Sequence, residues 1–287
     1  MLSRQAALAE AHPESVIRAA DGRLVELKAH RGAWSGAHPA NSLAAVRECF
    51  AERVARVEID FRSRGDEFVV AHDKPRKGAR VPLLRDALEI VRASPPGPTV
   101  LMLDAKDEAP WPRNTALAIA RLCDPVRDRV FVGSPADWNL RLLRKVDPAL
   151  AIAFDPQYYL TWDSRVHVVP GRRGAYGYQD VHPLALRRTV SAADYLRERI
   201  DNLLRAVDGI REVHLRLAFF ERMLRDGFDA ASFAHEANVL VDVWTLDAGT
   251  RAWKSRLAHA VAAGADIVTT NTPREFAATL AGDATRE

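Results

Sequence analysis

The chain has 287 residues, of which 48% are apolar and 28% are charged, and its formal net charge is +3. This length and apolar fraction suit one large α/β domain or two small ones. The balance of acidic and basic residues argues against a nucleic-acid-binding protein, while the slight basic excess suits an anionic ligand. Two cysteines, Cys49 and Cys123, lie within apparent helices and are expected to be buried thiols in a reducing compartment.

Neither a secretory signal nor a membrane span is expected. The first 23 residues lack a long apolar core, and no later run approaches the length of a membrane-spanning helix. We therefore expect a cytoplasmic protein without stable membrane insertion. Residues 1–23 are interpreted as an extension that precedes one domain at 24–287.

Apolar runs of strand length alternate with segments of helical periodicity. The strands are expected at 24–29, 56–61, 99–105, 129–132, 150–154, 212–217, 239–245 and 266–270, with a further short run at 67–71. The helices are expected at 41–53, 82–92, 114–122, 137–145, 184–207, from about 219, at 250–263 and at 273–280.

Such alternation predicts a parallel sheet covered by helices, and eight repeats in this length predict a closed (β/α)8 TIM barrel. The alternative is an open doubly wound sheet. It is disfavoured because no glycine-rich nucleotide-binding loop follows the first strand.

The first strand poses a packing problem. Alternation along residues 24–29 puts Glu26 and Lys28 on the same side as His30, which would carry two charges into the barrel core. We expect either a very short strand or a bulge that reorients His30.

An irregular insert at 155–183 follows the fifth strand and has no clear period. Its rings are Tyr158, Tyr159, Trp162, Tyr176 and Tyr178. Long inserts of this kind are often functional, so the rings could contact a sugar, choline or acyl group, and Arg172 and Arg173 an anion. The alternative is a surface cover in which the tyrosines only pack.

Carboxylates recur on the predicted strands. Glu58 and Asp60 lie two residues apart, so both point to one side of their strand, and Asp104 repeats this placement on the next barrel strand. Three carboxylates at the mouth of a barrel predict a hard divalent cation, Mg²⁺ or Ca²⁺. Alternatively, Asp104 forms a structural ion pair with Lys106 or with an arginine.

The remaining candidates fit a phosphodiester substrate. His30 and His72 each follow a short apolar run, and two histidines near neutral pH can serve as acid and base. Arg31 and Lys106 could hold phosphate oxygens. Trp244 ends a strand and could stack on substrate, although tryptophans are often core residues.

The other histidines are interpreted as surface or packing residues. His182 and His214 are the two for which this interpretation has the weakest support.

Four motifs, in this order and spacing, resemble the glycerophosphodiester phosphodiesterase family, within the phosphatidylinositol-phospholipase-C-like phosphodiesterase barrels. They are HRG at 30–32, PANS at 39–42, EID at 58–60 and HD at 72–73. The likeness continues more weakly through LMLDAK at 101–106, FVGS at 131–134, VDVWTLD at 241–247 and ADIVTTNTP at 265–273.

The resemblance implies a (β/α)8 barrel that hydrolyses glycerophosphodiesters, or a related lysophospholipid, to an alcohol and glycerol 3-phosphate. It implies a role in lipid metabolism and a bound divalent cation. The implied acid–base pair is His30 and His72, the implied metal ligands are Glu58, Asp60 and Asp104, and Arg31 and Lys106 are implied to lie near phosphate. In that family, the glycerol 2-hydroxyl attacks first and water then opens a cyclic phosphate.

The sequence departs from the family pattern at four positions. Ala40 and Asp104 each stand where glutamate is usual, Asp247 where asparagine is usual, and Asn271 where aspartate is usual. Two alternative functions therefore stay open. One is a phospholipase-D-like lyase that stops at the cyclic phosphate, and the other is a non-catalytic binder of phosphorylated ligands.

Overall fold

The computed structural model describes residues 4–162 and 173–277. Its central feature is a barrel of eight parallel strands, in which β12 pairs with β2 and β2 with β3. The barrel strands are β2 (Leu24–Ala29), β3 (Arg56–Arg64), β5 (Val100–Ala105), β6 (Val130–Ser134), β7 (Ala151–Phe154), β10 (Glu212–Arg216), β11 (Leu240–Trp244) and β12 (Ile267–Thr270). The (β/α)8 prediction is confirmed, and the open sheet is wrong.

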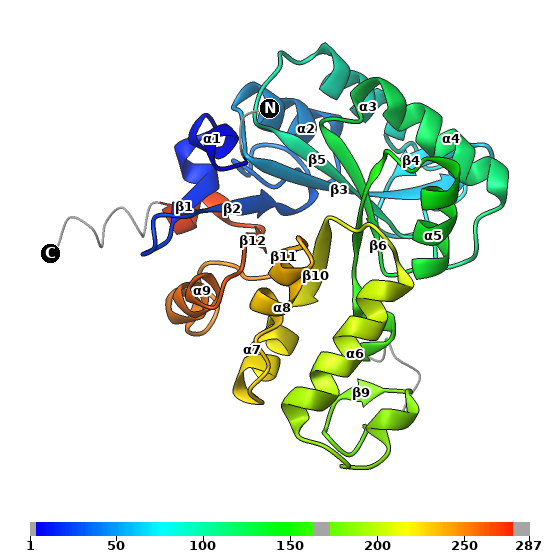
Figure 1. The fold of residues 1–287 in the computed structure, drawn as a ribbon. Helices are drawn as coiled ribbons and strands as arrows, with labels where there is room; N and C mark the ends of the chain where they lie inside the picture. The colour runs from blue at the N-terminus through cyan, green and yellow to red at the C-terminus, as the bar shows by residue number, and fades with distance from the viewer. Residues whose placement is uncertain (1–3, 163–172, 278–287) are drawn as a thin grey trace, which may run out of the picture.

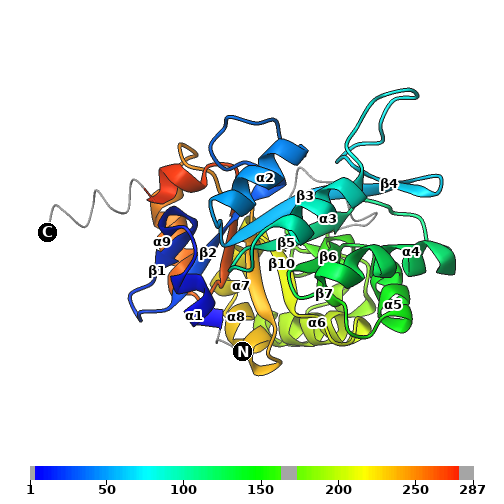
Figure 2. The ribbon, with the colours of Figure 1, turned by 90° about the horizontal axis from the view of Figure 1, so that it is seen from above.

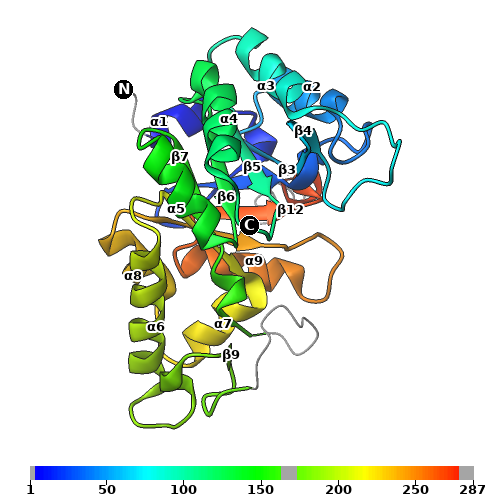
Figure 3. The same ribbon diagram turned by 90° about the vertical axis from the view of Figure 1, so that its right-hand side faces the viewer.

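Helices surround the barrel on its outer face (Figures 1, 2 and 3). They are α2 (Leu43–Ala51), α3 (Leu84–Ala93), α4 (Arg113–Cys123), α5 (Asp137–Val146), α6 (Ala192–Ala206), α7 (Leu217–Arg225), α8 (Ala230–Glu236) and α9 (Trp253–Ala262). Strand residues such as Val57, Ile59 and Leu103 have no exposed surface, because they face these helices. The main apolar core is therefore the layer between the barrel and its helices.

Two predicted helices differ from the structure. The helix expected at 184–207 begins only at Ala192, where the hydroxyl of Ser191 accepts a hydrogen bond from Asp194 N at 3.1 Å. The helix expected from about residue 219 is divided into α7 and α8 by a turn at Gly227, whose φ of 84° suits glycine. Residues 273–277 are helical, and the rest of the helix expected at 273–280 lies outside the described residues.

Short antiparallel strands extend the barrel sheet at two places. β1 (Val16–Arg18) pairs with β2, and β4 (Glu67–Val70) pairs with β3. A separate two-stranded sheet, β8 (Leu160–Thr161) and β9 (Gln179–Asp180), lies in the insert after β7.

The described part of the N-terminal segment packs against the barrel. Helix α1 (Arg4–Ala9) buries Leu8, and Arg4 donates hydrogen bonds to the Glu26 carboxylate at 2.8 Å and to the Asp266 carbonyl at 3.0 Å. Glu26 belongs to β2 and Asp266 immediately precedes β12. The segment therefore covers the amino-terminal end of the barrel.

Charged side chains fill much of the barrel interior. Arg56 donates to Glu26 and to Glu212, both at 2.5 Å, and Lys28 donates to Asp242 at 2.5 Å. All five side chains are buried. The expected short strand or bulge at the start of the barrel is wrong, because β2 keeps its full length and the opposite charges on β3, β10 and β11 neutralise Glu26 and Lys28.

Replacement of Arg56 tests this interior. Although burial favours the neutral acid, Arg56 lowers the pKa of Glu212 to about 2. Arg56→Met removes the cation that Glu26 and Glu212 share and leaves Glu26 with Arg4 as its remaining guanidinium partner. We therefore expect a loss of about 3–5 kcal/mol in the free energy of unfolding, measured with urea at neutral pH. The exposed pair Arg205–Asp201 provides the control, since Arg205→Met should cost less than about 1 kcal/mol.

The stabilisation from Glu212 is present above its unfolded pKa of 4.5 and is lost as the pH falls toward 2. Arg56→Met should remove this contribution to the dependence of the free energy of unfolding on pH. An equal cost for the Arg56 and Arg205 substitutions would contradict the proposed contribution of the interior ion pairs.

Candidate active site

A cavity of about 290 Å³ opens at the carboxyl ends of the barrel strands. Among its lining residues are seven that the sequence singled out: His30, Arg31, Glu58, His72, Asp104, Lys106 and Trp244. The cavity also reaches side chains that were not proposed as site residues: Lys28, Met102, Asp155, Gln157, His214, Asp242, Thr245 and Thr269. Alternation on β10 and β11 could have indicated His214 and Asp242, since each lies two residues before a strand-end residue.

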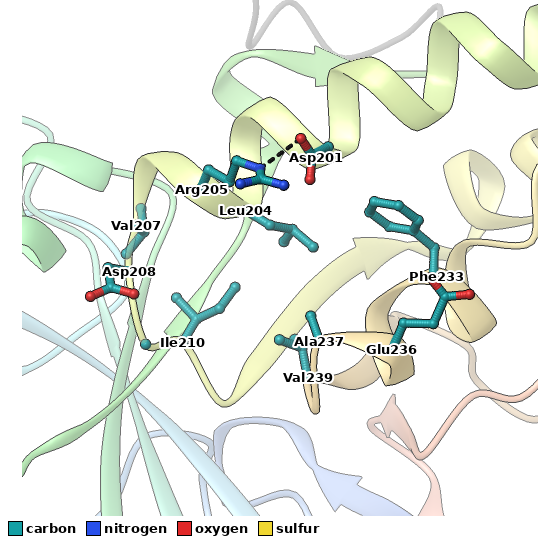
Figure 4. A pocket seen from close by; sticks show the side chains of 11 residues that line it. Asp201, Leu204, Arg205, Val207, Asp208, Ile210, Phe233, Glu236, Ala237 and Val239 are labelled. Carbon is teal, nitrogen blue, oxygen red and sulfur yellow. Dashed lines mark hydrogen bonds and ion pairs between the residues drawn. The ribbon is translucent and has the colours of Figure 1, made fainter.

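A larger hollow of about 520 Å³ lies between α6 and α8, outside the barrel (Figure 4). Its wall includes the apolar side chains of Leu204, Ile210 and Phe233. Two of its charged residues, Asp201 and Arg205, pair with each other at 2.7 Å. It lacks the convergent acids and bases of the barrel cavity, which is therefore the candidate active site.

Three carboxylates meet beside the barrel cavity. Asp60 on β3 is the register partner of Asp104 on β5, and one oxygen from each of Glu58, Asp60 and Asp104 lies within 4.8 Å of the other two. Burial, together with the nearby Asp60 and Asp104, raises the pKa of Glu58. Glu58 Oε1 is buried without a hydrogen-bond partner, so the donor set fits a hard cation.

Basic and amide groups hold this acidic trio together. Lys106 Nζ lies 3.0 Å from Asp60 Oδ1 and also bonds Asp104, so the ion pair considered for Asp104 is present alongside the trio. Asn41 donates to Asp60 Oδ2 at 2.7 Å and accepts from Asp60 N at 2.9 Å. Burial alone would raise the pKa of Asp60, but Lys106, Asn41 and Arg31 lower it.

The role of Asn41 was missed in the sequence. The helix expected from residue 41 begins at Leu43, and its N-cap is Ser42, whose hydroxyl accepts from Ala45 N at 3.1 Å. Asn41 has a φ of 57°, and its side chain turns toward the barrel instead. The sequence feature that could have indicated this role is the PANS motif at 39–42, which contains Asn41.

His30 directly follows β2, and its ring is oriented by two side chains. His30 Nδ1 lies 2.8 Å from Asn271 Oδ1, and Asn271 Nδ2 donates to Asp247 at 2.9 Å. Because that second bond fixes the orientation of the amide, Asn271 Oδ1 accepts the Nδ1 proton and the His30 Nε2 lone pair is left free. Burial lowers the pKa of His30, and Arg31 adds to this against the opposing effect of Asn271. The imidazole is thus neutral at neutral pH.

His72 follows β4 and lines the same cavity as His30. Its carbonyl accepts from Arg62 Nε at 2.7 Å, and its Nδ1 lies 2.8 Å from the Asp73 carboxylate. His72 is 43% exposed whereas His30 is 22% exposed, so the two histidines line one cavity in different environments.

Arg31 and Trp244 present further polar groups. Arg31 adopts a φ of 56°, and its Nε lies 3.0 Å from Asp60 Oδ2. The indole N–H of Trp244 is buried without a hydrogen-bond partner, and the Arg216 guanidinium lies 5.2 Å from the indole ring centre. Trp244 can therefore donate a hydrogen bond to a bound ligand.

The insert contributes to the cavity through polar side chains. Asp155 and Gln157 line it, and burial raises the pKa of Asp155 to about 8. Tyr176 and Tyr178 are buried, which favours the packing interpretation for these two rings. Arg172 lies outside the described residues.

No protein-family model matches the chain, and no curated protein matches it. Solved structures do match its fold. A glycerophosphodiester phosphodiesterase from Parabacteroides distasonis aligns over 90% of this chain and 97% of its own, with a TM-score of 0.61 and 15% identity.

Two further solved structures give similar alignments. An Oleispira antarctica phosphodiesterase, in complex with the product sn-glycerol-3-phosphate, covers 89% and 97% of the two chains at a TM-score of 0.54 and 15% identity. A glycerophosphodiester phosphodiesterase from Agrobacterium tumefaciens covers 88% and 99% at a TM-score of 0.54 and 16% identity. At this level of identity, the likeness establishes a shared fold.

Glu58→Gln tests whether the acidic trio is a cation site. The raised pKa of Glu58 means that the folded protein favours its protonated form. In the absence of a cation, Glu58 therefore lowers the free energy of unfolding as the pH rises above the pKa that this residue has in the unfolded chain. At pH 8 and in EDTA, Glu58→Gln should raise the free energy of unfolding by about 1–3 kcal/mol. It should also abolish any rise in melting temperature on addition of Mg²⁺ or Ca²⁺.

The exposed Glu89 provides the control, because Glu89→Gln should leave the response to cation unchanged. In the parent protein, cation affinity should fall as the pH is lowered, since protons compete for Glu58. A full cation response in Glu58→Gln would exclude this residue as a ligand.

Proposed function

We propose that this protein is a phosphoric diester hydrolase of the glycerophosphodiester phosphodiesterase type. Its proposed substrate is a glycerophosphodiester or a lysophospholipid-like phosphodiester, and its products are an alcohol and glycerol 3-phosphate. The observation that carries the proposal is one cavity whose lining includes His30, His72, Arg31 and Lys106 beside a trio of carboxylates. The glycerol 3-phosphate in the Oleispira structure, which has the same fold, supports this choice of product.

Glu58, Asp60 and Asp104 would hold a divalent cation, either Mg²⁺ or Ca²⁺. When bound, such a cation neutralises phosphoryl oxygens and lowers the barrier to attack by an oxygen nucleophile. Lys106 and Arg31 lie at the same carboxylates and would bind the remaining phosphate charge. Trp244 would donate its free indole N–H to the substrate.

His30 is the proposed general base. Its imidazole is neutral, and Asn271 holds its Nδ1 proton so that Nε2 can accept a proton from the attacking hydroxyl. His72 is the proposed general acid and would give a proton to the leaving alcohol. Asp73 accepts from His72 Nδ1, which leaves Nε2 as the nitrogen that carries the transferred proton.

The direct test is turnover by the purified, folded protein of a panel of glycerophosphodiesters and lysophospholipids with Mg²⁺, with Ca²⁺ or with EDTA. We expect release of glycerol 3-phosphate that EDTA abolishes and added cation restores. No product from any member of the panel would refute the proposal. Retention of tight binding to phosphorylated ligands in that case would support the non-catalytic alternative.

A lyase that stops at the cyclic phosphate is the second candidate. It is favoured by Ala40, an exposed side chain without a polar group at a position where the resembled family has glutamate. Attack by a hydroxyl of the substrate needs only the acid–base pair and the phosphate-binding groups, whereas opening of the ring needs an activated water in addition. Phosphorus NMR of the product separates a cyclic phosphate from glycerol 3-phosphate.

Substitution of the two histidines gives the expected size of the acid–base contribution. His30→Gln and His72→Gln should each lower kcat by about 10²–10⁴-fold, because each removes one proton-transfer group. His38 is an exposed histidine in the loop between His30 and α2, and His38→Gln serves as the matched control with kcat unchanged. Parental kcat in either His30→Gln or His72→Gln would remove that residue from the mechanism.

The carboxylate of Asp247 and the amide of Asn271 should control how kcat/KM depends on pH. In the parent, kcat/KM should rise with pH through a pKa below 6.5, as His30 loses its proton. The exchange variant Asp247→Asn/Asn271→Asp keeps the net charge but puts a carboxylate against His30 Nδ1. A carboxylate stabilises the protonated imidazole, so the rise of kcat/KM should move to a pH about one unit higher.

Titration of the His30 ring protons by NMR in the cation-free exchange variant measures the same shift without turnover. If neither the pH dependence of kcat/KM nor the ring titration changed, Asn271 would not control the protonation of His30.

A further inference from the structure

Exposed aliphatic side chains are concentrated between β9 and α6. Val181 is 57% exposed, Leu186 71% and Val190 52%, and these are the exposed large hydrophobic side chains among residues 4–162 and 173–277. A single exposed aliphatic side chain is ordinary on a protein surface, but three within ten residues form a patch that suits a contact. We call residues 181–190 the rim segment.

Buried aromatic rings hold the backbone of the rim segment in place. The Tyr176 hydroxyl donates to Val190 O at 3.2 Å and accepts from Thr189 N at 3.2 Å and from Val190 N at 3.3 Å. Tyr176 itself is buried and stacks on Tyr195, with ring centroids 4.2 Å apart. The aliphatic side chains therefore point outward from an ordered backbone.

The charge of the rim segment is entirely basic. Its sequence, VHPLALRRTV, contains two arginines and no acidic residue. Arg187 and Arg188 are both exposed. The acid just before the segment, Asp180, is buried and paired with Arg199 at 2.6 Å. Aliphatic side chains next to arginines complement a surface whose anionic layer covers an apolar interior.

The rim segment lies at the end of the barrel that holds the cavity. It belongs to the connection from the carboxyl end of β7 to the start of α6, and such connections line the active-site end of a parallel barrel. Figures 1 and 3 both show the lobe that carries β9 and the start of α6 projecting beyond the barrel. A flat surface can therefore reach the rim segment.

We propose that the rim segment docks the protein peripherally on an anionic phospholipid bilayer. Val181, Leu186 and Val190 enter the headgroup region, and Arg187 lies among the lipid phosphates. A stable protein partner usually needs about 20–30 residues on each side, far more than this patch, whereas a lipid surface needs only a few apolar side chains and cations. No helix within the described ranges is long and apolar enough to cross a membrane, and the proposal requires none.

The test is co-sedimentation of the full chain with phosphatidylcholine vesicles, with and without phosphatidylserine. We expect binding to the vesicles that contain phosphatidylserine, and we expect this binding to weaken as salt is added. Leu186→Ser/Val190→Ser should lower the partition coefficient by about tenfold, because it removes apolar area that enters the lipid. Arg187→Glu should lower it by about fivefold or more.

Arg205→Glu is the matched control, since it makes the same charge change at the far end of α6, where the side chain is 77% exposed. It should leave vesicle binding close to that of the parent. Because the rim side chains are exposed, their variants should keep the parental melting temperature and the parental behaviour toward water-soluble substrates.

Three results would overturn the lipid assignment. The first is a parent protein that does not bind phosphatidylserine vesicles at low salt, and the second is a serine variant that binds them as the parent does. The third is parental self-association, measured by light scattering, that the serine variant loses, since this would assign the rim segment to a second copy of the chain. Vesicle binding is measured without turnover, so it stands or falls separately from the proposed hydrolase activity.

Discussion

Repulsion among three neighbouring carboxylates is the constraint around which the candidate active site is arranged. The register of β3 against β5 puts Asp60 beside Asp104, and the strand period puts Glu58 on the same side. Cations and donors then gather at these oxygens: Lys106 forms ion pairs with Asp60 and Asp104, Arg31 forms an ion pair with Asp60, and Asn41 donates a hydrogen bond to Asp60. The turn after β2 and the loop before α2 are therefore shaped by the same charge that makes the site suited to a metal ion.

The interior below the site follows the same rule of compensation. Aliphatic layers usually fill such barrels, but here Glu26, Arg56 and Glu212 form one buried ion-pair group, and Lys28 and Asp242 form another. Lys28 and Asp242 also line the cavity floor. The protein thus has a column of charged side chains through the barrel. At its Glu26 end, Arg4 of the N-terminal segment donates a hydrogen bond to the Glu26 carboxylate.

The barrel was predictable because segments of strand length, with apolar residues on at least one face, alternate with segments of helical period along the chain. Glu58 and Asp60 were recognisable from a spacing of two. Lys28–Asp242 was not, because its partners lie 214 residues apart and only the closed barrel brings them together. The start of α6 was misplaced because the apolar period runs on through 184–191, and the cap at Ser191 decides the boundary. Asn271 could be noted only as a departure, because its contact with His30 is a tertiary one.

The ion pairs inside the barrel also influence how the fold responds to heat. A charged interior removes less apolar surface from water than aliphatic layers would, which lowers the heat-capacity change of unfolding and flattens the curve of stability against temperature. The hydration of charged groups becomes less favourable on warming, so the penalty for burying Arg56 and its partners shrinks. The free energy of unfolding of this barrel should therefore fall more gradually at high temperature than that of an equally large barrel with an aliphatic interior.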